Sequence, residues 1–580
     1  MRKLVVLCLT TFIALMLAAP SADAANPLPA ANDGSSAGDW PGIANDPSLS
    51  GDNRAESAIT PANVHSMKAA WTSRGAGGLF STTIVAAQRL FVNELDGGVT
   101  ALNALTGRKL WSWNDSRSWG IAASGGLLYV STDRTTVHGR ITSGVVALDQ
   151  ATGKVRWTTY GSFTDQYQPW GSPTVGNGRI YASFDGGLAV ALDPATGKVL
   201  WKRGASRAPA DTVGSSFSYS DERLYAATGS GSAVFSAVTG RVLWHYDSGH
   251  AIPRIMGSRG IVTGNQSVVA MPAGGCGQPT CKPLWVNKDY PGATSVALTK
   301  RYVVLGLEQP AGTPSIAILD IASGKTLWRG YGPRGAFVAV AGQTIFATDG
   351  SDGIGVAAFA LDGCGKARCR PLWSGTYSTL GSIPSGPPIV SHGTLYYSTV
   401  DINTPEIIAF RPPVATVDGP AYAYLGHPVT ITGTAPAGAT VSVWFHRRGA
   451  SSYVKSRTVR ADAFGVWTTT YHADEDYLYY ATSGTSTSRP ALTRIVSTIS
   501  GPSHVRAGHK ATIRGIGRPR AVLHIWFHRR NAGGYVMRRT VRADAAGHWT
   551  TSFTADTDYR YYAVDIATGQ PTPSVRTLGR

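Results

Sequence analysis

The sequence predicts an all-β protein: an eight-bladed β-propeller followed by two small β-sandwich domains. Two internal repeats indicate this fold. Eight tryptophans recur at intervals of 40 to 46 residues through the first two thirds of the chain, and a second repeat with an offset of 82 residues fills the remainder. Short apolar runs bounded by glycine-containing turns occur in both parts, and such runs are typical of strands.

The first repeat has the length of a four-stranded propeller blade. Residues 190–201 are representative: an apolar strand, a Thr-Gly turn and a short strand that ends in tryptophan. Residues 178–187, just upstream, have the pattern of a second strand pair, so each period predicts four strands. The eight tryptophans are Trp71, Trp111, Trp157, Trp201, Trp244, Trp285, Trp328 and Trp373.

These repeats closely resemble the tryptophan-docking repeats of the pyrroloquinoline-quinone (PQQ) type propeller superfamily, and the resemblance covers residues 39–411. It implies that each of the eight tryptophans packs between neighbouring blades. Seven of them follow a full set of blade strands, whereas Trp71 has no blade strands before it. We therefore expect residues 68–71 to supply the outer strand of the eighth blade, which would close the ring and protect sheet edges.

The N-terminus predicts export. Residues 1–24 have the pattern of a signal peptide, with Arg2 and Lys3 before an apolar run that contains Cys8, and a small-residue cleavage site at the end. No later run of eighteen apolar residues occurs, so no transmembrane segment is expected. Residues 25–66 are expected to form a partly extended leader before the propeller at 67–412. The expected location is secreted or associated with the cell surface.

Four further cysteines form two pairs with the same spacing. Cys276 and Cys281, like Cys364 and Cys369, replace the Thr-Gly turn of a blade. Export and this short separation predict one disulfide within each hairpin. A zinc site would need four ligands together, but the two pairs lie two blades apart.

The C-terminal third is a tandem repeat, and it predicts two sandwich domains at residues 413–495 and 496–580. Both copies contain the sequence Trp-Phe-His-Arg-Arg, followed by alternating strand patterns.

Each copy resembles the bacterial immunoglobulin-like domains of exported proteins. The resemblance implies that Trp444 and Trp526 are the central core tryptophans. It also implies that Tyr479 and Tyr561 occupy the position of a tyrosine corner.

Positive charge is concentrated in the last domain. Residues 496–580 hold thirteen Lys and Arg against four Asp and Glu, which is half of the chain's net charge of +18. Such a surface attracts polyanions. The expected partner is a protein or an anionic cell-envelope polymer rather than nucleic acid, and the alternative is a basic surface without a specific ligand. The candidate polyanion contacts are Arg447, Arg448, Arg529 and Arg530.

The PQQ superfamily includes alcohol and sugar dehydrogenases, whose quinone site is implied to need adjacent cysteines, calcium ligands and a catalytic aspartate. Here no two cysteines are adjacent, none lies between Cys8 and Cys276, and the blades are short. No catalytic residue, metal ligand or cofactor is therefore predicted.

The leading hypothesis is a monomeric, non-catalytic binding or scaffold protein of the bacterial cell envelope or exterior, since the superfamily includes an envelope-assembly lipoprotein that works by protein contacts. In this hypothesis the propeller is an interaction platform and the two sandwiches are a spacer or anchor. The alternative is a PQQ- and calcium-dependent dehydrogenase with a diverged active site.

Overall fold

A computed structural model gives the fold of the chain from residue 38 to residue 579. The signal peptide expected at 1–24 and the first part of the expected leader lie outside the described residues. The internal segments that are not described are 75–81, 95–96, 136–140, 161–168, 170, 185–186, 204–215, 229–230, 247–250, 265, 309–312, 334, 350–354, 376–382, 385, 401–405, 421, 448–449, 451, 485, 531, 533–534, 567–570 and 573.

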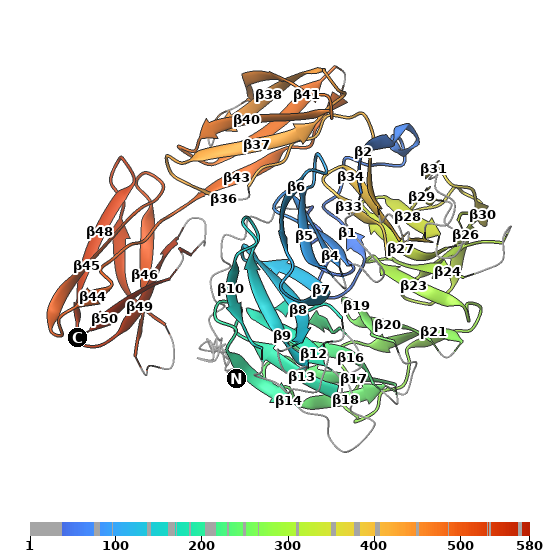
Figure 1. Cartoon of the computed structure of the whole chain (residues 1–580), viewed down its shortest axis with the longest axis horizontal. Helices are drawn as coiled ribbons and strands as arrows, with labels where there is room; N and C mark the ends of the chain where they lie inside the picture. The colour runs from blue at the N-terminus through green and yellow to red at the C-terminus, as the bar shows by residue number, and fades with distance from the viewer. Residues whose placement is uncertain are drawn as a thin grey trace, which may run out of the picture.

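The first part of the described chain forms eight successive antiparallel sheets, which stand around a common centre as the blades of a propeller (Figure 1). Blades 1 and 2 consist of β3 (Thr83–Ala86), β4 (Arg89–Glu94), β5 (Gly98–Asn103), β6 (Lys109–Trp113), β7 (Arg117–Ser124), β8 (Leu127–Thr135), β9 (Ile141–Asp149) and β10 (Val155–Thr158). Blades 3 and 4 consist of β11 (Thr174–Gly176), β12 (Arg179–Phe184), β13 (Leu188–Leu192), β14 (Val199–Arg203), β15 (Ser218–Ser220), β16 (Arg223–Thr228), β17 (Gly231–Ser236) and β18 (Val242–Tyr246).

The remaining blades follow the same order. Blades 5 and 6 consist of β19 (Arg254–Met256), β20 (Arg259–Gly264), β21 (Ser267–Pro272), β22 (Trp285–Asn287), β23 (Ala293–Leu298), β24 (Tyr302–Leu307), β25 (Ile316–Asp320) and β26 (Thr326–Gly330), with β30 (Arg368–Cys369) added to β26. Blades 7 and 8 consist of β27 (Gly335–Ala341), β28 (Thr344–Asp349), β29 (Val356–Ala360), β31 (Trp373–Gly375), β32 (Ile383–Pro384), β33 (Ile389–Ser391), β34 (Thr394–Val400) and β35 (Glu406–Arg411), together with β1 (Asp52–Asn53) and β2 (Lys68–Arg74).

Burial explains the sequence pattern within a blade. The third strand of blade 3, β13, is buried at all five positions because the neighbouring blades cover both of its faces. The last strand, β14, alternates between half-buried and exposed positions, since it forms the outer edge of the blade. A buried strand is therefore a continuous apolar run, whereas the outer strand also exposes an apolar side chain, Leu200, at 46% exposure.

Seven of the eight repeat tryptophans join their blade to the next by lying on a glycine. The ring of Trp157 packs against Gly197 in the following blade, where a Cβ atom would lie 2.5 Å from Cε3 of the indole. The indole N–H of Trp157 donates a hydrogen bond to the carbonyl oxygen of Pro194 in the same turn (3.0 Å). The same ring-on-glycine contact joins Trp71 to Gly107, Trp111 to Gly153, Trp201 to Gly240, Trp244 to Gly275, Trp285 to Gly324 and Trp328 to Gly363. Trp373 packs instead against Phe410 in blade 8, with ring centroids 5.4 Å apart.

The ring closes as the sequence predicts. Strand β2, which contains Trp71, pairs antiparallel with β35 along its length, from Lys68 opposite Arg411 to Arg74 opposite Glu406. The outer strand of blade 8 therefore comes from a segment that precedes blade 1. This pairing removes the free edge that β35 would otherwise present.

Residues 38–53 differ from the expected leader, because they are folded against the propeller. Backbone hydrogen bonds join this segment to the first strands of six blades, through Trp40 with Val85, Pro41 with Ala123, Pro47 with Tyr219, Ser48 with Ile255, Ser50 with Leu298 and Gly51 with Val340. The side-chain amide of Asn53 then donates to the carbonyl oxygens of Gly38 (2.7 Å) and of Val390 in blade 8 (2.8 Å). Because the first strands of a propeller line its axis, this segment lies across one end of the central channel. We call residues 38–53 the axial loop.

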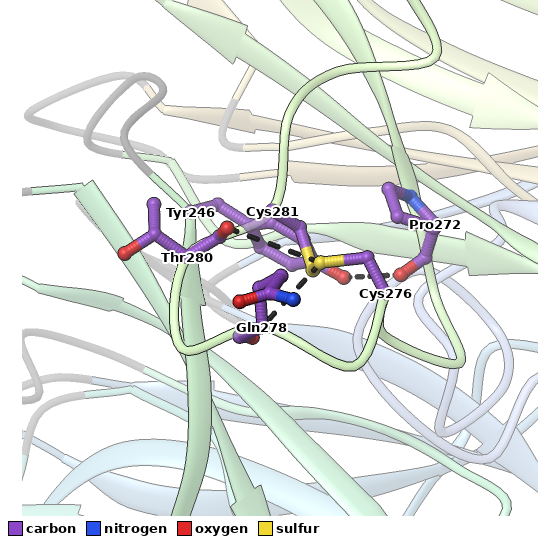
Figure 2. Close-up of a disulfide and its surroundings, with 6 residues drawn as sticks. All are labelled: Tyr246, Pro272, Cys276, Gln278, Thr280 and Cys281. Atoms are coloured by element: carbon purple, nitrogen blue, oxygen red, sulfur yellow. Dashed lines mark hydrogen bonds between the residues drawn. A yellow bond between two sulfur atoms is a disulfide. The ribbon is translucent and has the colours of Figure 1, made fainter.

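Both expected disulfides are present, Cys276–Cys281 in blade 5 and Cys364–Cys369 in blade 7. Figure 2 shows the first of them beside Tyr246, whose hydroxyl donates to the carbonyl oxygen of Pro272 (2.5 Å). The turn that it closes pairs with the outer strand of blade 4, since Cys281 N–H donates to the carbonyl oxygen of His245 (3.2 Å). In the same way β30, which ends at Cys369, pairs with β26 of blade 6. Each disulfide therefore shapes a turn that covers the edge of the preceding blade.

The C-terminal part forms two structures of the same kind, each with a large and a small sheet packed over one apolar core. The first contains β36 (Tyr422–Tyr424), β37 (Pro428–Thr434), β38 (Thr440–Arg447), β39 (Val454–Arg460), β40 (Val466–His472), β41 (Tyr477–Ser483), β42 (Ser486–Thr487) and β43 (Ala491–Val496). The second contains β44 (His504–Val505), β45 (His509–Ile516), β46 (Val522–Arg529), β47 (Val536–Arg542), β48 (His548–Ala555), β49 (Tyr559–Asp565) and β50 (Val575–Gly579). Their immunoglobulin-like classification stays a prediction.

The expected core role of Trp444 and Trp526 is wrong. The core tryptophans are Trp467 and Trp549, at 1% and 4% exposure, whereas Trp444 and Trp526 are only half-buried. On β38 it is Val443 and Phe445 that point into the core. Side chains alternate between the two faces of a strand, so Trp444 lies on the opposite face.

The tyrosines expected at a corner are fully buried. The hydroxyl of Tyr479 shares a hydrogen bond with Thr493 Oγ1 (2.9 Å), which donates in turn to the carbonyl oxygen of Pro420 (2.7 Å). Tyr561 and Thr577 repeat this arrangement in the second sandwich.

The ring-on-glycine contact can be tested with Gly197→Ala. Gly126→Ala is the matched control, because both glycines have a φ near +70° but only Gly197 has an indole within 4 Å of the new methyl group. Chemical denaturation should show that Gly197→Ala lowers the free energy of unfolding by about 2 kcal/mol more than Gly126→Ala does, since the methyl group must displace the Trp157 ring. Equal losses would mean that backbone strain alone accounts for the effect.

Candidate functional site

A cavity of about 630 Å³ lies where the propeller meets the first sandwich. Its walls come from the chain between the axial loop and β2, from the β33–β34 turn, from the connection after β35 and from the turn before β43. The polar groups of the wall include Glu56, Asn63, His392, Asp418 and Arg489. The cavity is therefore built by four separate segments of the chain.

His392 joins the β33–β34 turn to the axial loop and to the connection after β35. Its Nε2 lies 2.8 Å from a carboxylate oxygen of Asp39 in the axial loop, and its Nδ1 lies 3.7 Å from Asp418, next to the first sandwich. The amide of Gln88 in blade 1 donates to the other oxygen of Asp418 (3.2 Å). We call Asp39, Glu56, His392 and Asp418 the junction cluster.

Glu56 holds the backbone around the cluster. One of its carboxylate oxygens accepts hydrogen bonds from the N–H groups of Ser57, Ala58 and Ile59, at 2.7, 2.6 and 3.2 Å. The other oxygen accepts from the N–H of Gly393 (2.8 Å). This carboxylate, at 4% exposure, therefore fixes the chain after the axial loop to the β33–β34 turn.

Electrostatics keep His392 charged. Burial alone would lower the pKa of His392, but the carboxylates of Asp418, Asp39 and Glu56 outweigh burial and raise this pKa to about 10. The imidazole therefore carries a positive charge at neutral pH, and it cannot accept a proton as a general base there. The cluster can clamp the two parts of the molecule, and its cavity can bind a polar ligand.

A second cavity of about 460 Å³ lies against the axial loop, lined by Asp46, Asp52, Arg54 and Met256 among others. Arg54 Nε lies 2.8 Å from a carboxylate oxygen of Asp52. Burial raises the pKa of Asp52 to about 6 although Arg54 opposes the shift. These side chains offer an ion pair and a thioether to a ligand.

The candidate polyanion contacts lie on the sandwiches, away from both cavities. Arg447 forms ion pairs with Asp474 (3.5 Å) and Glu475 (3.4 Å), and Arg529 forms one with Asp556 (2.7 Å). Arg530 is exposed, and Arg448 lies outside the described residues.

Two of these arginines are therefore already paired with carboxylates. The structure thus shows which of these exposed cations have carboxylate partners, a distinction that the sequence could not provide.

Among the residues that the structure describes, we find no set that fits a quinone and calcium site. Among the described residues, no three His, Cys, Asp or Glu side chains come together as a metal-binding group would require. The cysteines that could flank a quinone form disulfides in the turns before β22 and β31. No reaction step is therefore assigned to such a group. In the described part of the chain, no helix has the length and apolar character needed to cross a membrane.

The ring of tryptophan-closed blades defines a propeller of the PQQ repeat type. The family model described as outer membrane protein assembly factor BamB matches residues 58–183 and 142–412, which together are more than half of the chain. The chain belongs to this family.

Individual relatives include both enzymes and an assembly factor. A polyvinylalcohol dehydrogenase of a Pseudomonas species is 30% identical over 136 residues, a match that covers 22% of this chain and 20% of that enzyme. The chain thus spans about a fifth of the length of this relative. A quinohemoprotein alcohol dehydrogenase from Comamonas testosteroni has a TM-score of 0.49 and 15% identity, covering 65% of this chain and 81% of that one. BamB from Moraxella catarrhalis has a TM-score of 0.44 and 14% identity, covering 60% of this chain and 97% of that one.

The charge of His392 predicts that the stability of the protein depends on pH. The folded pKa of about 10 exceeds the unfolded value near 6.5, so the stabilisation is complete below about pH 6.5 and is lost as the pH rises through about 10. Urea unfolding of the wild type and of His392→Gln at several pH values should show a difference in unfolding free energy that shrinks over this range. His65→Gln, at an exposed histidine of η1 (Val64–Ser66), is the control and should follow the wild type. If the difference in unfolding free energy between the wild type and His392→Gln were the same at every pH, charged His392 would not hold the two parts of the molecule together.

Proposed function

We propose that this protein is an exported, non-catalytic binding or scaffold protein of the bacterial cell envelope or exterior. The propeller is its interaction platform, and the two sandwiches are its spacer or anchor. The observation that carries the proposal is the axial loop, because residues 38–53 lie across one end of the channel around which a propeller enzyme would build its pocket. The match to a family described as an assembly factor supports the same role.

The charges of the second sandwich support the anchoring part of the proposal. Its four aspartates include three that are paired with arginine: Asp565 with Arg518, Asp556 with Arg529, and Asp558 with Arg576. Nine other cations of this sandwich are exposed: Arg506, Lys510, Arg514, Arg520, Arg530, Arg538, Arg539, Arg542 and Arg560. With most of the carboxylates already neutralised, the field of this sandwich attracts an anionic envelope polymer.

The alternative function is a PQQ- and calcium-dependent dehydrogenase, and the local identity with polyvinylalcohol dehydrogenase is the observation that favours it. The scaffold proposal and this alternative differ in activity, so a single assay separates them.

Incubation of the full chain with PQQ and calcium should give no dye-linked oxidation of alcohols, sugars or polyvinyl alcohol above the rate without protein. A quinoprotein dehydrogenase reconstituted in parallel shows that the assay works. Turnover that depends on both additives would reject the non-catalytic proposal and support the alternative.

Removal of three exposed charges tests the anchor. The variant Arg538→Gln/Arg539→Gln/Arg542→Gln on β47 should sediment less with isolated bacterial cell walls than the wild type does, and the loss should be largest at low salt. The variant Arg457→Gln/Arg460→Gln/Arg494→Gln removes the same charge from β39 and β43 of the first sandwich and should retain more binding. Equal retention of the two variants would show that the second sandwich has no special role.

A further inference from the structure

Each sandwich has a group of aromatic side chains on the outer side of its large sheet. In the first sandwich the group comprises Trp444, His446, Tyr453 and Tyr480. Trp444 and Tyr480 are partners on β38 and β41, and their rings are parallel with centroids 5.9 Å apart. Tyr453 packs edge-on against Tyr480 at 4.7 Å, and His446 lies 5.0 Å from Tyr453. We call such a group an aromatic face.

The second sandwich has a corresponding aromatic face, formed by Trp526, His528, Tyr535 and Tyr562, of which Tyr562 is buried. Trp526 and Tyr562 are parallel at 6.3 Å, Tyr535 packs edge-on against Tyr562 at 4.8 Å, and His528 lies 5.2 Å from Tyr535. All four positions follow those of the first sandwich by 82 residues.

The aromatic face is separate from the core. On β38, Val443 and Phe445 are buried between the two sheets, and Trp444 between them points to the other side. Trp444, Tyr453 and His446 are half-buried, so part of each ring is exposed to solvent. The core therefore does not explain why these residues are aromatic.

Positions next to the aromatic residues differ between the two copies. Trp444 has Lys455 as its other strand partner, whereas Trp526 has Met537. Leu478 opposite His446 corresponds to Arg560 opposite His528. The two faces thus have the same aromatic residues. Each also has one exposed cation among these strand partners, opposite the tryptophan in the first face and opposite the histidine in the second.

We propose that the aromatic faces bind an acidic polysaccharide. The apolar C–H side of a pyranose ring packs against the exposed part of tryptophan and tyrosine rings, which combine apolar area with polar edges. In each face one cation, Lys455 in the first and Arg560 in the second, is placed to attract a carboxylate of the bound polysaccharide. Two such faces on one molecule engage a long polymer at two points and raise its apparent affinity. This inference names the partner class of the sandwiches and rests on the proposed anchoring function.

A single-stranded nucleic acid would also stack on aromatic rings, but it carries one phosphate for every nucleotide and needs a cationic groove along the strand. Each aromatic face supplies one cation among the strand partners described above, which suits a polymer with sparser charge. The observations therefore favour the polysaccharide, and nucleic acid is one outcome of the test.

The test uses affinity electrophoresis of the full chain in gels that contain hyaluronate, in which only alternate sugars carry a carboxylate, neutral dextran or poly(dT). Hyaluronate should retard the wild type more than the other two polymers do. The variant Trp444→Ala/Trp526→Ala should need about tenfold more hyaluronate for the same retardation, the effect expected when a stacking ring is lost. Phe464→Ala removes a ring of 49% exposure from the β39–β40 turn and should behave as the wild type.

Equal retardation of the double variant and the wild type would overturn the proposal, as would stronger retardation by poly(dT). If the double variant lowers the melting temperature, Lys455→Gln/Arg560→Gln leaves the rings in place and should still weaken the retardation by hyaluronate; unchanged retardation there would also overturn the proposal. Turnover with PQQ and calcium would refute the non-catalytic function and leave the binding result intact, so the two failures are distinguishable.

Discussion

The propeller depends on the contact between an indole ring and a glycine of the next blade. The ring needs a flat place to lie, and the turn needs a residue with positive φ. Glycine satisfies both requirements, as at Gly197 beneath Trp157, where φ is +70° and a methyl group would collide with the ring. The indole N–H satisfies a carbonyl of the same turn. One residue pair thus sets the spacing between blades and seals the gap between their outer edges.

Sheet edges are the second constraint on this molecule, and the chain covers them in several ways. Strand β2 pairs with β35 and closes the ring, while the disulfide-bonded turns pair with the outer strands of blades 4 and 6. The axial loop satisfies backbone groups of the first strands at the centre. A propeller of short blades is thereby completed from segments that lie outside the regular four-stranded repeat.

The sequence predicts the repeating parts well because their signals are local. The tryptophan period predicts the number of blades, and the lack of blade strands before Trp71 predicts how the ring closes. The equal spacing within the two cysteine pairs predicts the disulfides. The junction cluster has no such signal, since Asp39 and His392 are 353 residues apart and only the fold brings them together. The sequence predicts the wrong face for Trp444 because Val443, Trp444 and Phe445 are all apolar. In such a run the side that faces the core is set by pairing with other strands, not by the residues themselves.

The axial loop has a consequence for how the chain folds. Asn53 forms a hydrogen bond with Val390, which follows it by 337 residues, and β2 cannot form its pairing before β35 has been made. A chain made from its N-terminus therefore cannot complete either contact until the last blade has been synthesised. Contacts of such long sequence separation slow folding and leave early segments exposed to aggregation. Ring closure is thus a late step for this protein, and Asn53 and β2 remain without these final partners until it occurs.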